Sequence, residues 1–231
     1  MTENDIPRPQ FLSLIAHEFR TPLAVILSSS EILRHYSDRL PPEKRDHNFD
    51  LIKSEINRLT TMMDDVLLLS RLAAEQVELQ SIAIEVDPFC RELTARLTDN
   101  GHDVHFTAAQ PPAGSVETDP DFLQMVLGRL LDNAIKFSPS GTPVHLLARR
   151  AEDRLCFEVR DSGIGIPPDE QATVYEPFKQ GSNIGRISGS GLGLSIVRQY
   201  LMLMGGTITM ESVENEGTTV VVIVPANAPT P

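Results

Sequence analysis

Two long apolar stripes, neither of which a single helix can cover, constrain the fold of this chain most. Between residues 10 and 36, apolar side chains recur every three or four positions, which is the spacing of one face of an α-helix. A second stripe follows the Pro41-Pro42 turn and repeats in a near-heptad. The stripes consist of Phe11, Ile15, Phe19, Leu23, Ile26 and Leu33, and of Ile52, Ile56, Leu59, Met63 and Val66. We therefore predict an N-terminal helical hairpin.

A hairpin with one stripe on each helix leaves apolar surface uncovered. A dimer that forms a four-helix bundle buries both stripes. Packing of the hairpin against the second half of the same chain is the alternative. The sequence therefore predicts a homodimer built on the hairpin.

After about residue 80 the pattern changes to short strand-like runs that alternate with helices. The clearest strand-like runs are 82–86, 143–149, 155–161 and 218–224. We predict an α+β chain with a domain boundary near residue 78, so that residues 1–78 form the hairpin and 79–231 form an α/β sandwich.

Two helix starts can be predicted within the second half. Asp87-Pro88 and Asp119-Pro120 each place a capping carboxylate before a proline that suits the first helical turn. We expect these helices to run through Arg96 and Phe137, respectively.

Composition excludes several classes of function. The chain has 20 Lys and Arg against 32 Asp and Glu, a net charge of −12, and no Trp. Such an acidic chain is not expected to bind nucleic acid or an anionic membrane in general. Cys90 and Cys156 lie too far apart for a zinc or redox motif, which indicates buried thiols in a reducing compartment. No apolar run reaches the roughly 18 residues of a membrane span, and no signal peptide is recognised, so we expect a cytoplasmic chain without a membrane span.

His17 is the first candidate for chemistry. It projects about 165° from the mean direction of the first stripe, so its imidazole is predicted to face solvent. Thr21 lies one turn further on the same face, and the Glu18 carboxylate can orient or deprotonate a ring nitrogen. Pro22 cannot bond the Glu18 carbonyl, so we expect the helix to bend or loosen here. An exposed histidine by itself is usually only surface.

Asp161 ends an otherwise apolar row on its strand, and a carboxylate there needs a donor partner. The next residues, Ser162-Gly163-Ile164-Gly165-Ile166-Pro167, form a turn whose glycines permit close backbone approach. The combination suits a flat, amine-bearing ligand such as adenine. A structural turn with a capping aspartate is the alternative.

A glycine-rich segment and one helix flank could hold phosphate. Gly189-Ser190-Gly191-Leu192-Gly193-Leu194 runs into an apolar helix, an arrangement typical of a phosphate cradle. On the helix that follows Pro120, Arg129, Asn133 and Lys136 fall within about 60° of one another. This flank could complete a Mg-nucleotide site, although any one of these residues could simply be solvated. The polar residues 180–188 between the two glycine motifs resemble a lid that closes over a ligand.

Taken together and in order, these motifs resemble the transmitter portion of bacterial sensor histidine kinases over nearly the whole chain. His17-Glu18-Phe19-Arg20-Thr21-Pro22-Leu23 resembles the phosphoacceptor box, and Asn133-Ala134-Ile135-Lys136-Phe137 the asparagine box. Asp161 to Ile166 and Gly189 to Leu194 resemble the two glycine boxes, and Tyr175-Glu176-Pro177-Phe178 the phenylalanine box.

The resemblance implies a dimerization and histidine-phosphotransfer hairpin followed by a catalytic ATP-binding sandwich of the GHKL (Bergerat) type. It implies ATP-dependent autophosphorylation of His17, with Glu18 as general base, and phosphoryl transfer to an Asp of a response regulator receiver domain. It also implies phosphatase activity, in which Thr21 orients water. Asn133 would bind Mg²⁺ and Asp161 would accept from adenine. The remaining nucleotide contacts implied are Lys136, Gly163, Gly165, Phe178, Gly189, Gly191, Leu192, Gly193 and Leu194.

Arg129 departs from the family pattern, because the family usually has asparagine at this position. Its charge could neutralise phosphate, or the side chain could lie along the helix in solvent. Only sixteen residues precede His17, so we expect either a piece of a longer, membrane-anchored receptor or input from another protein. The alternatives are another ATPase of the same superfamily, against which His17, Glu18 and Thr21 argue, and an inert dimeric scaffold, which only Arg129 favours.

Overall fold

The chain divides into two compact units, Met1–Leu67 and Leu68–Pro231. The structure, a computed structural model, describes residues 8–74, 77–98, 103–185, 187 and 189–226. Each unit is therefore considered by itself.

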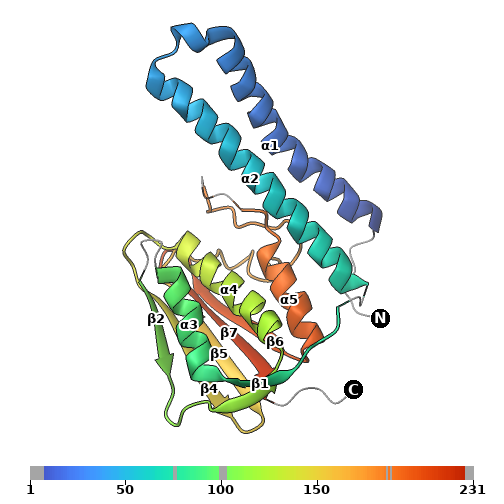
Figure 1. The fold of residues 1–231 in the computed structure, drawn as a ribbon, viewed down its shortest axis with the longest axis vertical. Coiled ribbons are helices and arrows are strands. Elements are labelled where there is room, and N and C mark those ends of the chain that lie inside the picture. The colour runs from blue at the N-terminus through green and yellow to red at the C-terminus, as the bar shows by residue number, and fades with distance from the viewer. Residues whose placement is uncertain (1–7, 75–76, 99–102, 186, 188, 227–231) are drawn as a thin grey trace. The chain divides into compact units, whose positions relative to one another are not determined.

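The first unit contains the predicted helical hairpin except for the last residues of its second helix, from Leu68 on, which fall in the second unit. Helix α1 (Arg8–Tyr36) is followed by the short helix η1 (Ser37–Arg39) and then by α2 (Pro42–Ala73), which runs antiparallel to α1 (Figure 1). Helix α1 continues through Pro22, and the expected bend or loosening of the helix there stays a prediction. The Pro41 carbonyl accepts from the amides of Lys44 and Arg45, which begins α2 directly after the turn.

Much of the apolar surface of this unit is exposed. On α1, Leu23 and Leu27 are 54% and 63% exposed, and on α2, Ile56 and Met63 are 49% and 50% exposed. The segment Phe11–Arg39 is also long and apolar enough to span a membrane when only length and composition are considered. This is weak evidence for a membrane span, because the core helix of a soluble protein or a signal sequence passes the same test.

The second unit is a two-layer α/β sandwich. Its five-stranded sheet has the order β2-β4-β5-β7-β6, in which only β2 and β4 pair in parallel. Helices α3, α4 and α5 lie on one face of this sheet (Figure 1). The bounds are β2 Val104–Ala108, β4 Val144–Ala151, β5 Arg154–Arg160, β6 Thr207–Val213, β7 Gly217–Pro225, α3 Val86–Thr98, α4 Pro120–Phe137 and α5 Gly193–Leu203.

The core of the sandwich lies between the sheet and these helices. Fully buried apolar side chains come from both layers, because the strands alternate and the helices present one apolar stripe each. Among them are Leu123, Leu127 and Leu131 of α4, Ile196 of α5, and Leu146, Leu155 and Val222 of the sheet. The predicted sandwich is confirmed.

A separate two-stranded sheet pairs β1 (Ile82–Glu85) with β3 (Ser115–Thr118). The next residue, Asp119, caps α4 as predicted, since its carboxylate accepts from the amides of Asp121 and Phe122. The prediction for Asp87 is wrong: α3 begins at Val86, whose amide bonds to the Gly114 carbonyl, and this places Asp87 inside the first turn.

Candidate functional site

His17 occupies the exposed position on α1 that the stripe predicts. Its side chain is 72% exposed, and its Nδ1 lies 3.3 Å from the Oε1 of Glu18. An ionised carboxylate can only accept a hydrogen bond, so this geometry assigns the ring proton to Nδ1. The lone pair of a neutral imidazole then lies on Nε2, which faces away from that bond.

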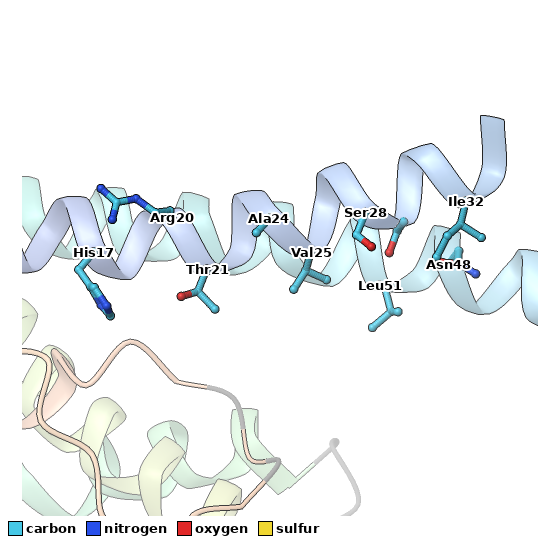
Figure 2. Close-up of a pocket in the computed structure, with 10 residues that line it drawn as sticks. His17, Arg20, Thr21, Ala24, Val25, Ser28, Ile32, Asn48 and Leu51 are labelled. Carbon is cyan, nitrogen blue, oxygen red and sulfur yellow. The ribbon is translucent and has the colours of Figure 1, made fainter. Parts of the chain in front are cut away.

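A groove of about 610 Å³ lies beside His17 on the hairpin. Figure 2 shows the side chains of His17, Thr21 and Val25 on one side of α1, with Leu51 and Asn48 contributed by α2. The full lining is His17, Arg20, Thr21, Ala24, Val25, Ser28, Ser29, Ile32, Asn48 and Leu51. The groove therefore combines an exposed imidazole with small polar and apolar side chains from both helices.

In the second unit, the Asp161 carboxylate is held by backbone amides. Its Oδ1 accepts from Gly163 at 2.8 Å and from Thr218 at 3.2 Å, and its own amide donates to the Thr218 carbonyl. Burial raises the pKa of Asp161 above the ordinary 3.8, and these two hydrogen bonds partly oppose the shift. Within the described residues, both hydrogen bonds fall on Oδ1, which leaves Oδ2 available to a ligand.

The turn after Asp161 requires glycine for steric reasons. A Cβ at Gly163 would lie 2.5 Å from the Phe137 carbonyl oxygen, and one at Gly165, where φ is +63°, would collide with the Val213 carbonyl. The turn is thereby wedged between the end of α4 and the β6–β7 hairpin. Gly163 and Gly165 thus shape the site through the backbone.

Asn133 and Lys136 on α4 face the glycine-rich segment that begins α5. A Cβ on Gly193 would lie 3.6 Å from the Asn133 amide nitrogen, and one on Gly189 would collide with the Lys136 ammonium. The ammonium also lies 4.6 Å from the Phe137 ring centre. The predicted flank and the predicted cradle therefore meet, leaving an amide and a cation beside a helix N-terminus.

The phenylalanine box is joined to the second glycine box. The Phe178 amide donates to the Gly191 carbonyl at 2.9 Å, and both residues have positive φ, +65° and +69°. Leu192 is fully buried at the start of α5, while Leu194 is half-buried. Phe178, Gly191 and Leu192 thus anchor the segment, and their direct contact with a ligand stays a prediction.

Side chains of the predicted lid, residues 180–188, form hydrogen bonds with both glycine-rich segments. Gln180 donates to the Gly189 carbonyl at 2.7 Å, and the Asn183 amide nitrogen donates to the carbonyls of Ile164 and Gly165. Within the expected lid, Arg186 and Ser188 lie outside the described residues.

The side chain of Arg129, a residue of α4, lies near Tyr200 of α5. Its Nε donates to the Met125 sulfur at 3.3 Å, and its charge lowers the pKa of Asp132 and Tyr200 against the effect of burial. These contacts place part of the side chain toward the N-terminal half of α4, whereas Asn133 is one turn further on. Its predicted role at the phosphates stays a prediction.

Sequence reasoning missed Gly217 and Thr218, which hold Asp161 from the far strand. A Cβ on Gly217, where φ is +126°, would collide with the Asp161 carbonyl. The Asn215-Glu216-Gly217 turn was recognisable as a hairpin signal. Its contact with a residue more than fifty positions earlier was not, because the register of β5 and β7 sets it.

Comparison with known families accounts for most of the chain. Residues 8–75 match the His Kinase A (phospho-acceptor) domain. Residues 118–228 match the Histidine kinase-, DNA gyrase B-, and HSP90-like ATPase family. The first match contains His17, and the second contains Asn133, Asp161 and the glycine-rich segment.

Individual relatives agree with this division. The chain is 34% identical to Histidine protein kinase DivJ of Caulobacter vibrioides over 94% of its own length and 37% of DivJ. It is 32% identical to Signal transduction histidine-protein kinase BarA of Escherichia coli K12 over 92% of its own length and 24% of BarA. The chain therefore corresponds to well under half of these relatives.

Two solved structures show the same architecture. Full-length ShkA in complex with AMPPNP is 28% identical, with a TM-score of 0.66 over 96% of this chain and 47% of that one. Histidine kinase ThkA in complex with response regulator protein TrrA is 24% identical, with a TM-score of 0.75 over 94% of this chain and 61% of that one.

Proposed function

The chain belongs to the sensor histidine kinases, as their transmitter region, and on this premise we propose that it transfers the γ-phosphoryl group of ATP to His17. The observation that carries the proposal is the pairing of an exposed His17–Glu18 dyad on a hairpin with a second unit that unites Asp161, Asn133 and Lys136 around two glycine-rich turns.

In the proposed reaction, Nε2 of His17 attacks the γ-phosphorus. The N–P bond forms as the bond between that phosphorus and the bridging oxygen to the β-phosphate breaks, and ADP leaves with the electron pair. The Glu18 carboxylate keeps the proton on Nδ1 and stabilises the positive charge that develops on the ring. Because little covalent chemistry is required of the protein, positioning and charge neutralisation supply most of the catalysis.

We assign ATP to the second unit. Asp161 Oδ2 would accept from the adenine amine, while the Gly163 and Gly165 turn lets the ring approach the backbone. Lys136 and the amide end of α5 would hold the phosphates. The position of Lys136 supports this placement, because its ammonium lies directly beside Gly189 in the glycine-rich segment.

The residues present also fit Mg²⁺. Asn133 offers a neutral amide oxygen beside Gly193, a donor of the hard oxygen type that Mg²⁺ prefers, together with phosphate oxygens. When bound, Mg²⁺ would neutralise charge on the phosphates. No group of three or more His, Cys, Asp or Glu able to hold a metal is found in the described ranges, in keeping with a site completed by substrate.

Two protein partners follow from the hairpin. A second copy would cover the exposed apolar residues of α1 and α2, among them Leu23, Leu27, Ile56 and Met63, and form a four-helix bundle. A response regulator receiver domain would dock on the groove beside His17, which brings its aspartate to the phosphoryl group. Membrane attachment is not needed to explain the apolar face of α1.

Thr21 lines the same groove, and we assign it to orienting water during dephosphorylation of the regulator. Thr21→Ala should then keep autophosphorylation and slow phosphate release from the regulator. We place this region in the cytoplasm, where ATP is available, and the two free thiols, Cys90 and Cys156, fit that reducing compartment.

The test is incubation of the chain with labelled ATP and Mg²⁺. We expect label that is alkali-stable and acid-labile, as a phosphohistidine is. His17→Gln should abolish labelling and leave ATP affinity unchanged. His35→Gln is the matched control, because His35 is another exposed histidine of α1 with a glutamate partner, Glu31, at 3.1 Å. Label retained in the His17 variant would refute the assignment, and ATP hydrolysis without label would favour another ATPase of the superfamily.

A further inference from the structure

Asp119 joins three segments of the second unit at one carboxylate. It is 5% exposed, and its Oδ1 accepts from the amides of Asp121 and Phe122 at 3.0 Å each, which caps α4. Its Oδ2 accepts from the amide of Gln80 at 2.6 Å. The cap therefore uses only half of the carboxylate, and the other half holds the segment that arrives from the hairpin.

Gln80 precedes β1, and Asp119 directly follows β3, the partner of β1. Ile82 pairs with Thr118, so the bond from Gln80 to Asp119 extends this small sheet by one more link through a side chain. The connection that leaves α2 at Ala73 is thus fixed at Gln80, before the first strand begins.

The same carboxylate lies close to the packing of α4 against α5. Burial, and to a smaller extent the charge of Asp119, raises the pKa of Tyr200. The Tyr200 ring meets that of Phe122 edge-on at 4.6 Å. At their other ends, these two helices carry Asn133 and Gly193, which face each other. The connecting segment is therefore bonded to the base of the helix pair that frames the proposed nucleotide site.

We propose that Asp119 is a positioning residue for phosphoryl transfer: through Gln80 it fixes where the connection from the hairpin meets the ATP-binding unit. This inference rests on the proposed function. Asp119 touches neither reacting group, and it acts on the encounter of His17 with ATP while leaving ATP binding alone. Orientation of this kind affects the rate at saturating substrate.

Asp119→Asn separates the two tasks of the carboxylate. Asparagine caps helices as well as aspartate does, so its oxygen can still accept from Asp121 and Phe122. Its NH₂ group would face the Gln80 amide, donor against donor, and break that bond. Gln80→Pro removes the donor from the other side and keeps Asp119. Asp121→Asn is the matched control, because it changes an exposed acid in the same helical turn.

The experiment measures, in the full chain, the rate of His17 labelling at saturating ATP, the ATP dissociation constant, and hydrogen exchange of the Gln80 amide. For Asp119→Asn and Gln80→Pro we expect labelling of His17 to slow about tenfold, because each variant loses one charge-assisted hydrogen bond. The ATP dissociation constant should stay within about twofold of wild type. The Gln80 amide should lose protection in Asp119→Asn, whereas Gln80→Pro has no amide hydrogen at this position. Asp121→Asn should match wild type throughout.

An unchanged labelling rate in Asp119→Asn, with Gln80 protection lost, would overturn the inference. So would a parallel loss of ATP affinity, which would make Asp119 only a structural cap. Failure of the proposed function is distinguishable, because then wild type itself would carry no label on His17 while the amide exchange still reports the bond.

Discussion

The two units of this chain treat their apolar residues in opposite ways. Among the described residues, ten of the thirteen large apolar side chains that are exposed lie on the hairpin, and only Ile82, Met202 and Val213 lie on the sandwich. The sandwich closes its core between a sheet and three helices. The hairpin cannot do so with two helices, because each packs one stripe and leaves another face open.

The two units therefore have different requirements for folding. The sandwich contains the partners that its core and its turns need, down to the carbonyls against which Gly163 and Gly165 pack. The hairpin presents an exposed histidine, a groove and an apolar surface that its own two helices do not cover. We therefore interpret the hairpin as the partner-dependent unit and the sandwich as the self-sufficient one.

Dimer disruption should give the largest effect. Ile56→Asp places a charge on the exposed stripe of α2, where a second copy would bury it without a partner. We expect the dimer dissociation constant to rise at least about 100-fold, on the order of 2.7 kcal/mol. Sedimentation velocity over a concentration series measures this.

Val213→Asp is the control, because Val213 is a similarly exposed apolar residue of the sandwich, at 55%. It should leave the association state unchanged. If Ile56→Asp dimerises as wild type does, the apolar stripe is not the interface.

A glycine substitution tests the self-sufficiency of the sandwich. Gly165→Ala introduces a Cβ at positive φ and against the Val213 carbonyl, so we expect the free energy of unfolding to fall by about 2 kcal/mol. Gly141 also has a positive φ, +84°, but a Cβ there would meet open space. Gly141→Ala should therefore lower the free energy of unfolding by only about 1 kcal/mol. Urea unfolding of both variants gives the comparison, and equal losses would show that the contact with the β6–β7 hairpin is unimportant.

The local features of this site could be predicted from the sequence. The exposed side of α1 that holds His17, the Asp119 cap, and the shared flank of Asn133 and Lys136 all follow from periodicity or capping rules. The Asp87 prediction failed although its dipeptide is the same as at Asp119, because a tertiary bond from Val86 to Gly114 starts that helix earlier.

Contacts between distant segments could not be predicted. The hydrogen bonds of Thr218 to Asp161 and of Gln80 to Asp119 depend on strand register and on which loops meet. No local pattern encodes either. The family resemblance supplied the roles of the motifs, and it contains nothing about these two links.

The raised pKa of Asp161 predicts a smaller effect, with opposite signs for binding and folding. The carboxylate must be ionised to accept from adenine with charge assistance, so ATP affinity should fall as the pH drops through the raised pKa of Asp161. The folded chain binds the proton more tightly than the unfolded chain, so the free energy of unfolding should decrease as the pH rises through the same range.

Calorimetric titration of ATP across this range, with chemical unfolding alongside, measures both slopes. Asp161→Asn should bind ATP about tenfold more weakly near neutral pH and lose both pH dependences. A variant that keeps the wild-type pH profile would remove Asp161 from adenine recognition.

The smallest effect concerns Arg129. Its bond to Met125 and its charge near Asp132 and Tyr200 predict that Arg129→Ala lowers the free energy of unfolding by about 1 kcal/mol and ATP affinity by less than about tenfold. Thermal unfolding and ATP titration of the same sample separate these effects. A large loss of affinity at unchanged stability would instead assign the guanidinium to the phosphates.

We expect the exposed histidine of the partner-dependent unit to receive the phosphoryl group from ATP bound in the self-sufficient unit. The most direct test is peptide mapping by mass spectrometry, under alkaline conditions, of wild-type chain incubated with ATP and Mg²⁺. We expect one phosphoryl group, on the peptide that contains His17, attached to the imidazole of that residue. Phosphoryl groups on another residue, or an unmodified His17 peptide from chain that has consumed ATP, would contradict it.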